Sequence, residues 1–392
     1  MYELTLILLI GILAGVFTGL IPGVHINLVA AVLLGLSPIL IQYMPLSLVG
    51  VLIVTMSITH NFVDMVPAIF LGAPDDSTAL GVLPGHRYLL IGHGLMAVKL
   101  TVLGGIFGTI LVFLFFWPSM WLLEFLFTTT KHWVFWILLA FTFFTVLKDK
   151  KRMWAGLIFV LSGLVGIITL RLPLAEPLLP MLSGLFGVAT LLYSIKEKNT
   201  IPPQEDLPYT DFHPRKTIIG SLLGTIGAFI TALFPGISSA MAAALVSQGQ
   251  KLGDHGFMVL IGSLGSASFV LSLAAWLAIE KARNGAMAVV VQLGEINPVV
   301  LGGSMLVATG VAALVTLWLG KKAAIILPKI PYTQTCVAVI LFIVGIVYLR
   351  TSWLGLLVLG TSTAVGLLPA ALKTARAQGM GCLVLPLLVV LW

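Results

Sequence analysis

Long apolar runs of about bilayer length recur from one end of the chain to the other and restrict the fold more than any other feature. The clearest runs are residues 93 to 117, 131 to 147, 153 to 171, 174 to 194, 257 to 280, 298 to 320, 332 to 349 and 353 to 371. An α-helix needs about 20 apolar residues to cross the hydrocarbon core of a membrane. Only 9% of the 392 residues are charged, whereas about a quarter are charged in a soluble domain. The whole chain is therefore expected to lie in a membrane.

The apolar runs also distinguish between the two architectures that can cross a bilayer. In hydrocarbon, only α-helices and closed β-barrels satisfy the hydrogen-bonding groups of the backbone. The strands of a membrane barrel alternate apolar and polar residues in segments of about ten, and these runs do not alternate. The sequence predicts an all-α polytopic membrane protein with roughly ten to twelve membrane segments, which is a multi-pass protein of the cell membrane.

One polar interval divides the chain into two halves. Residues 196 to 216, KEKNTIPPQEDLPYTDFHPRK, are rich in proline and charge. They are predicted to link a first membrane half, residues 1 to 195, to a second, residues 217 to 392. Basic residues accumulate in cytoplasmic loops, so this linker and the run from Lys148 to Arg152 are placed in the cytoplasm. The net charge of +7 then reflects topology and contact with lipid headgroups, and no nucleic-acid partner is expected.

The two halves share a glycine-framed segment that is interrupted by proline. GILAGVFTGLIPGVHINLVAAVLL lies in the first half and GTIGAFITALFPGISSAMAAALVS in the second, and a shift of 213 residues superposes Pro22-Gly23 on Pro235-Gly236. Proline can simply kink a continuous membrane helix, but a break at corresponding places of two halves indicates a transporter site. We expect two repeats, inverted relative to each other, and each with a re-entrant hairpin that is broken at Pro-Gly.

Each break would create a helix start that attracts anions. The first N–H groups of a helix lack intrahelical partners, and the helix dipole adds partial positive charge there. Uncharged side chains near the breaks can donate to carboxylate or phosphate oxygens, although they can equally serve as helix caps. The residues predicted to bind an anionic substrate are Pro22, Gly23, His25, Asn27, Pro235, Gly236, Ser238 and Ser239.

A second group of polar residues interrupts the first half, in the stretch ITHNFVDMVPAIFLGAPDDSTALGVLPGHRYLL. Ionisable side chains in a membrane segment are costly and mark ion or proton pathways by default. His60 and Asp64 are four residues apart and share one face of a helix, which permits a proton relay. Asp75 and Asp76 fit an exposed loop equally well. The residues predicted to handle a coupling proton or sodium ion are His60, Asn61, Asp64, Asp75 and Asp76.

The remaining polar residues in apolar surroundings receive simpler explanations. Lys99 lies near the start of an apolar run, where its ammonium group can reach the membrane interface or pair with an anion or with Asp64. The two cysteines lack metal-ligand spacing, so no metal site is predicted, nor any cofactor beyond the coupling ion. A non-spanning stretch of the second half carries a further group without an assigned role, namely Glu280, Lys281, Arg283, Asn284 and Glu295.

Three stretches resemble the large membrane subunit of tripartite tricarboxylate transporters, the TctA family, and especially its shorter archaeal-type relatives. They are GLIPGVHINLVAAVLLGLSP, PAIFLGAPDDSTALGVLPGHRYLLIGHGLMAVKLTVLGG and VGLLPAALKTARAQGMGCLVLPLLVVLW. The resemblance implies a secondary carrier for carboxylates that works with a small membrane subunit and a periplasmic binding protein.

The predicted function is secondary active transport of an organic anion, such as a di- or tricarboxylate, coupled to protons or sodium ions. The alternative is a translocase of a polyprenyl phosphate or a similar anionic lipid, since twinned re-entrant hairpins also resemble those of polyprenyl-phosphate translocases. The chain lacks the H-E-x-x-H and G-x-S-x-G signatures of hydrolases, so no enzyme activity is expected. Expected partners are the small anionic substrate, membrane lipid, and a small membrane subunit or binding protein.

Overall fold

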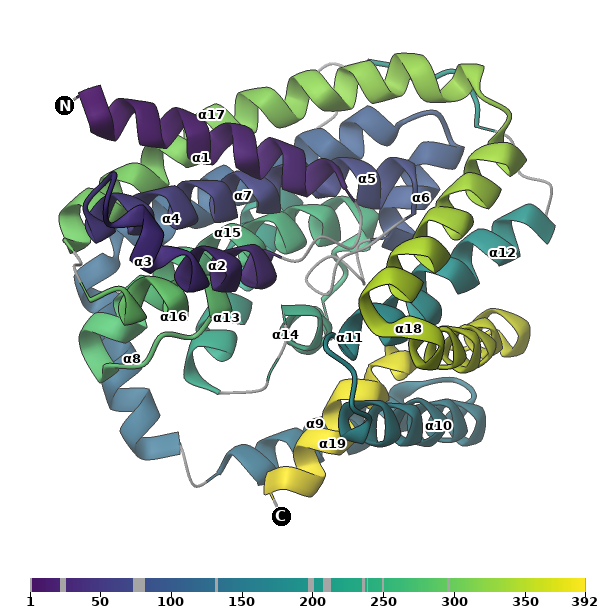
Figure 1. Cartoon of the computed structure of the whole chain (residues 1–392). Coiled ribbons are helices and arrows are strands. Elements are labelled where there is room, and N and C mark those ends of the chain that lie inside the picture. The colour runs from purple at the N-terminus through teal and green to yellow at the C-terminus, as the bar shows by residue number, and fades with distance from the viewer. Residues whose placement is uncertain are drawn as a thin grey trace.

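The computed structural model describes residues 2–21, 26–72, 82–130, 133–196, 201–206, 213–234, 237, 239–248, 250–294 and 297–391. Every regular element among these residues is a helix (Figure 1). The helices of the first half are α1 (Tyr2–Leu20), α2 (Ile26–Gly35), α3 (Ser37–Leu40), α4 (Leu46–Val63), α5 (Met65–Phe70), α6 (Val82–Leu90), α7 (Gly94–Leu114), α8 (Phe116–Thr130), α9 (Val134–Lys148), α10 (Arg152–Arg171), α11 (Leu178–Leu182), a π-helical segment (Ser183–Val188) and α12 (Ala189–Lys196). Those of the second half are α13 (Pro214–Leu233), α14 (Ser239–Val246), α15 (Gly253–Ile279), α16 (Gly285–Gln292), α17 (Pro298–Ile326), α18 (Tyr332–Leu372) and α19 (Gly381–Leu391), with short 3-10 turns at Leu327–Lys329 and Arg376–Met380.

Eight helices in the described part of the chain are long and apolar enough to cross a membrane. They are Tyr2–Leu20, Leu46–Phe70, Gly94–Leu114, Arg152–Arg171, Pro214–Leu233, Gly253–Ile279, Pro298–Lys329 and Cys336–Leu372. The bent pair of α8 and α9 supplies a ninth if it is counted as one span. The last of these spans belongs to α18, which contains Ser352 in a non-helical conformation with φ of 57°. These helices confirm the predicted all-α, multi-pass membrane fold.

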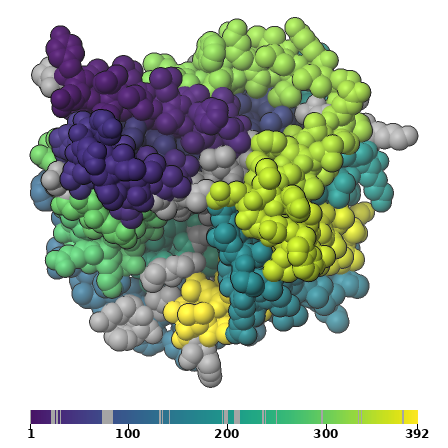
Figure 2. All heavy atoms as spheres, viewed as in Figure 1, coloured from purple at the N-terminus to yellow at the C-terminus, as the bar shows by residue number. Residues whose placement is uncertain are grey.

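The outer face of the helices is apolar, as lipid requires. On α1, the exposed side chains include Leu6, Leu9, Leu13 and Phe17. Figure 2 shows this helix at the surface of the molecule, at the purple end of the colour scale. The opposite face of α1 carries glycines that are buried against α4. One side of α1 is thus suited to lipid and the other to close helix packing.

α1 and α4 pack side by side and run in the same direction. A Cβ atom on Gly11 would lie 2.0 Å from Thr55 Oγ1, and one on Gly15 would lie 2.6 Å from Thr59 Cβ. A step of four residues along α1 is therefore matched by a step of four along α4. Small residues allow membrane helices to approach this closely. Because the two helices are parallel, the chain between them, which includes α2 and α3, returns to the end where α1 began.

α13 and α15 form a second parallel pair. A Cβ atom on Gly220 would lie 3.2 Å from Val259 Cβ, and one on Gly224 would lie 2.6 Å from Ser263 Cβ. A step of four residues along α13 is again matched by a step of four residues in the same direction along α15, so these two helices are parallel. The short helix α14 lies in the segment that returns to the start of α15.

The two parallel pairs begin at opposite ends of the helix bundle. The first turns of α1, α4 and α17 line a common pocket, and we call this the N-terminal end. Lys321, near the other end of α17, contacts Asp206 of the linker, which defines the linker end. α15 begins at the linker end, because its Asp254 forms an ion pair with Arg87 of α6, a helix that contacts the linker. Pro22-Gly23 and Pro235-Gly236 lie outside the described residues, so the re-entrant hairpins and the inverted repeats stay predictions.

The two halves meet where α7 crosses α15. A Cβ atom on Gly262 of α15 would lie 2.0 Å from the carbonyl oxygen of Thr101, and one on Gly104 of α7 would lie 2.0 Å from that of Val259. These distances leave no room for a side chain on either helix. Glycine at these two positions therefore sets the distance between the halves.

We expect Gly262→Ala to destabilise the protein, because the added methyl group must push α7 and α15 apart. Overpacking of this kind costs about 1–3 kcal/mol. Gly310→Ala in α17 is a matched control, since a Cβ atom there would meet nothing within 4 Å. Thermal unfolding of the purified protein in detergent should show a lower midpoint for Gly262→Ala alone. Equal midpoints for the two variants would contradict the crossing described here.

Candidate functional site

The centre of the candidate site is a polar contact between α4 and α15, which belong to different halves. Asn61 Nδ2 donates a hydrogen bond to Ser266 Oγ over 3.4 Å. The Asn61 side chain also lies against Gly265, where a Cβ atom would come within 2.7 Å of Asn61 Oδ1. Glycine on α15 thus makes the space that the amide of α4 occupies. The contact is uncharged and joins the two halves inside the bundle.

His60 connects this centre to the end of α1. Its Nδ1 lies 3.1 Å from Thr18 Oγ1, and the Thr18 hydroxyl donates to the carbonyl oxygen of Gly15 over 3.2 Å. The Thr18 hydroxyl thus links the His60 ring to the backbone of α1. The His60 side chain is buried, with 5% of its surface exposed. A movement of the end of α1 would therefore change or break the contact between Thr18 and the imidazole of His60.

Asp64 lies one helical turn after His60, at the joint between α4 and α5. It is 4% exposed, and its backbone N–H donates to the carbonyl oxygen of His60 over 2.8 Å. A Cβ atom on Gly19 would lie 3.2 Å from the Asp64 nitrogen, so Asp64 is level with the last turn of α1. A carboxylate at this depth is costly unless it is paired or neutralised.

The end of α13 reaches the same level from the opposite direction. Gly227 of α13 lies against Leu264 of α15, and α13 continues to Leu233, about 9 Å further along. Ser266 is two residues beyond Leu264 and lies within that interval. The last turns of α1 and α13 therefore flank the contact between Asn61 and Ser266. The helices that follow them, α2 and α14, each begin six residues along the chain after the preceding helix ends.

Several predicted site residues cannot be placed. His60, Asn61 and Asp64 are brought together at the centre, and Ser239 is half-buried as the first residue of α14. Asn27 belongs to α2, but its side chain is not described. Residues outside the described part of the chain are Pro22, Gly23, His25, Asp75, Asp76, Pro235, Gly236 and Ser238.

Two residues of the site, Thr18 and Ser266, were not predicted from the sequence. Thr18 and Ser266 are hydroxyl side chains in apolar helices, where such residues ordinarily bond to their own backbone. Only the packing of α1 on α4 and of α4 on α15 gives them the roles described above. The spacing from Thr18 to the Pro-Gly break was the one available hint, because it places the hydroxyl in the last turn before that break.

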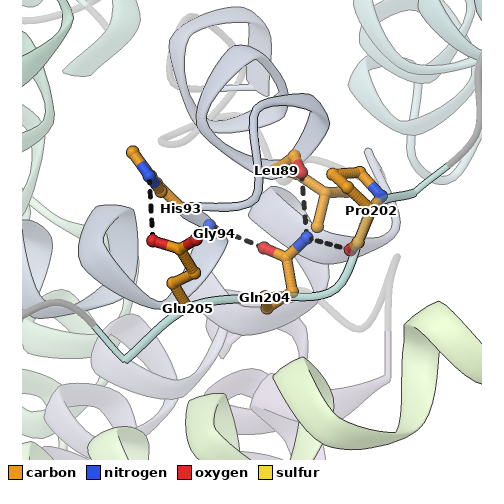
Figure 3. A network of polar contacts seen from close by, with 6 residues as sticks. All are labelled: Leu89, His93, Gly94, Pro202, Gln204 and Glu205. Atoms are coloured by element: carbon orange, nitrogen blue, oxygen red, sulfur yellow. Dashed lines mark hydrogen bonds and ion pairs between the residues drawn. The ribbon is translucent and has the colours of Figure 1, made fainter.

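The linker forms a separate polar network at its own end of the bundle (Figure 3). The Gln204 amide donates to the carbonyl oxygens of Leu89 and Pro202 over 3.0 and 2.8 Å and accepts from the Gly94 N–H over 2.8 Å. The backbone N–H of Glu205 donates to the carbonyl oxygen of Gly92 over 2.8 Å. Residues 201–206 thus lie as an ordered strap over the connection between α6 and α7.

Asp206 joins this strap to both halves through two lysines. Its carboxylate lies 2.7 Å from Lys99 Nζ of α7 and 3.5 Å from Lys321 Nζ of α17. Lys99 was expected to reach the membrane interface or to pair with an anion or with Asp64. Its ammonium group pairs with this carboxylate of the linker. The hydrogen bond from Lys99, together with the charges of Lys99 and Lys321, holds the pKa of Asp206 below its ordinary value.

Comparisons with known proteins find relatives over nearly the whole chain. A family model described as the tripartite tricarboxylate transporter TctA family matches residues 5–381, which include both halves and the candidate site. An uncharacterized protein from Methanocaldococcus jannaschii is 29% identical over 381 residues, which cover 91% of this chain and 94% of the relative. No solved structure matches the chain.

The contacts of Asp206 predict a pH-dependent contribution of the strap to stability. Because the pKa of Asp206 is lowered in the folded protein, the contribution is present above the ordinary carboxyl pKa and is lost as the pH falls through the lowered one. Asp206→Asn should lower the thermal midpoint at pH 7, and the difference from the unmodified protein should shrink in acid. Glu205→Gln is the control, since Glu205 only approaches His93 Nε2 at 3.8 Å. A difference that is constant with pH would contradict this assignment.

Proposed function

Since the chain belongs to the tripartite tricarboxylate transporter TctA family, we propose that it is a secondary active transporter of an organic anion, such as a di- or tricarboxylate. The family is one of transport proteins, so the chain is a component of a membrane transport system and not an enzyme. Its long apolar helices and its buried polar centre fit the permease of such a system. Proton or sodium coupling is part of the proposal.

The observation that carries the proposal is the meeting of helix ends from both halves at one uncharged polar contact. The ends of α1 and α13 flank the contact between Asn61 and Ser266. α2 and α14 follow α1 and α13 within six residues along the chain, and helix starts favour anions through their N–H groups and dipoles. Amide and hydroxyl groups add hydrogen bonds without adding negative charge. Such a centre suits a carboxylate better than a cation.

Asp64 supplies the coupling in this proposal. An anion near an ionised Asp64 would be repelled, and a proton or sodium ion on the carboxylate removes that repulsion. The binding of the cation and the binding of the anion then favour each other reciprocally. His60 contacts Thr18 in the last turn of α1, one helical turn before Asp64, where it can relay a proton or report the position of that helix. The cation and the substrate would therefore move together.

The tripartite nature of the family also bears on partners. A small membrane subunit and a substrate-binding protein are proposed as the other components, by analogy with the family description. The alternative function, translocation of a polyprenyl phosphate, receives no support from the family match. Uptake into vesicles by the purified protein tests both proposed functions. The substrates to screen are citrate, succinate and a polyprenyl phosphate, each under proton and sodium gradients. Selective transport of a cation or of a neutral solute would overturn the proposal.

Asp64→Asn should abolish gradient-driven accumulation of the anion while leaving exchange of bound anion across the membrane. The amide has the size of the carboxylate but takes up no proton or sodium ion. The measurement compares concentrative uptake with counterflow in the same vesicles. Glu124→Gln, an exposed carboxylate on α8, is the control and should retain both activities. Intact concentrative uptake by Asp64→Asn would rule out this coupling mechanism.

Replacing both Ser238 and Ser239 by alanine should weaken anion binding by about fivefold to about a hundredfold, because each of the two lost hydrogen bonds costs about 0.5–1.5 kcal/mol. Backbone N–H groups at the start of α14 would remain. The dissociation constant of the transported carboxylate is the quantity to measure. Ser304→Ala in α17, where the hydroxyl only bonds to the carbonyl oxygen of Val300, is the matched control. An unchanged constant for the double variant would remove these serines from the binding site.

A further inference from the structure

The loop between α15 and α16 contains a half-buried arginine, Arg283, whose buried donor edge has no acceptor among the described residues. α15 begins at the linker end and is 27 residues long, about 40 Å, so this loop lies at the N-terminal end (Figure 1). Within the described part of the chain, Arg283 Nε and Nη2 are buried and have no hydrogen-bond partner, and neither has Asn284 Nδ2. Buried polar groups in proteins are nearly always paired. Three unpaired donors on adjacent residues therefore need an explanation.

The backbone of this loop is held firmly in place. Glu280 ends α15 in a left-handed conformation with φ of 54°, which turns the chain back along the helix. The N–H groups of Arg283 and Asn284 then donate to Ser272 Oγ over 2.9 and 3.1 Å. Asn284 Oδ1 caps α16 by accepting from the Met287 N–H over 2.6 Å. The unpaired donors thus sit on a fixed turn and are not the ends of a loose loop.

The face of the guanidinium group is occupied, whereas its edge is not. The Arg283 Cζ lies 5.2 Å from the ring centroid of Phe127 of α8, and Lys281 Nζ lies 4.8 Å from the same centroid. A ring face attracts cations but does not replace an acceptor in the plane of the guanidinium group. Burial lowers the pKa of Arg283, but a guanidinium group remains charged in proteins. Glu280, the nearest carboxylate in sequence, is exposed.

The same edge of another arginine shows which ligand it fits. Arg87 uses its Nε and Nη2 to hold both carboxylate oxygens of Asp254, with 2.8 Å between Nε and Oδ2. Paired N–H groups of a guanidinium edge match the two oxygens of a carboxylate. Arg283 presents this edge without a carboxylate from the described part of the chain. The missing acceptor is therefore of the class that the proposed function would carry.

The position of Arg283 relative to the centre completes the argument. Ser272 is six residues beyond Ser266 along α15, a distance of about 9 Å. The loop that Ser272 holds lies between the N-terminal end and the contact of Ser266 with Asn61. An anion that enters from the N-terminal end would meet a cation before it reached the centre.

We propose that Arg283, with Asn284 Nδ2, binds a carboxylate group of the transported anion on the side of the N-terminal end. The proposal rests on the function proposed above and assigns that function a second binding position. The site is closed in this structure, because the donor nitrogens are buried, so binding requires the side chains that cover them to move. The carboxylate of the ligand would accept the hydrogen bonds that Arg283 and Asn284 do not make within the described part of the chain.

The test is the affinity of the full-length protein in nanodiscs for citrate and for succinate, measured by calorimetry. Arg283→Gln should weaken binding by about tenfold to a hundredfold, since it removes a charge-assisted pair of hydrogen bonds. Arg283→Lys should also weaken it, because an ammonium group keeps the charge but cannot make the paired contact. Asn284→Ser keeps a cap for α16 and removes Nδ2, so it should weaken binding less than Arg283→Gln does.

Arg171→Gln is the matched control, because Arg171 is an exposed arginine at the end of α10 and its loss should leave the affinity unchanged. If Arg283→Gln fails to fold, Arg283→Lys and Asn284→Ser decide the question. Unchanged affinity in both of these variants overturns the proposal and leaves the transport function standing. Absence of carboxylate binding and transport in the unmodified protein would overturn both.

A lipid headgroup could supply the same anionic chemistry. The affinities are therefore measured in nanodiscs of phosphatidylcholine and of phosphatidylglycerol, together with the thermal midpoint in each. If Arg283→Gln removes only a stabilisation by phosphatidylglycerol and leaves citrate and succinate binding intact, the site belongs to lipid and the proposal is wrong. A loss of carboxylate affinity in both lipids supports it.

Discussion

Close approach of helices at glycine positions is the interaction on which the rest of this structure depends. In lipid, burial of apolar side chains does not drive helices together, so packing contacts and interhelical hydrogen bonds must do so. α1 lies on α4, α13 on α15, and α7 on α15, at distances that a Cβ atom would not allow. Each contact fixes the direction and the depth of the helix that it holds. The depth at which α1 and α13 end, and therefore the position of the polar centre, follows from them.

The polar groups of the centre are arranged by this packing and not by local sequence. His60 meets Thr18 because α1 is held against α4, and Asn61 meets Ser266 because Gly265 leaves space for it. Both contacts join elements that a transport cycle would move relative to each other. Hydrogen bonds of this kind inside a membrane are individually modest, about 0.6 kcal/mol on average. They can therefore be exchanged for contacts with a substrate without large cost.

The sequence was sufficient for the fold class, and it identified two ionisable residues, His60 and Asp64, that the structure buries. Apolar runs of membrane length have few stable structures other than helices, and His60 and Asp64 are conspicuous because ionisable groups in hydrocarbon are costly. The partner of Lys99 could not be predicted, because the path of the linker decides it, and composition says only that the linker is polar. The unpaired donor edge of Arg283 could not be recognised from the sequence either. Its charge is visible in the sequence, but the absence of an acceptor appears only when the neighbouring residues of the described structure are placed.

The two halves place opposite chemistry at matching positions. The glycine contacts at Thr55 of α4 and at Ser263 of α15 are alike. Nine residues further along each helix, α4 carries Asp64, while α15 carries Ser272, whose hydroxyl holds the loop of Arg283. A carboxylate at both positions would repel an anion, and a cation at both would retain it. In the transport proposed above, Asp64 of the first half would take the coupling cation, and the loop of Arg283 in the second half would take the anion.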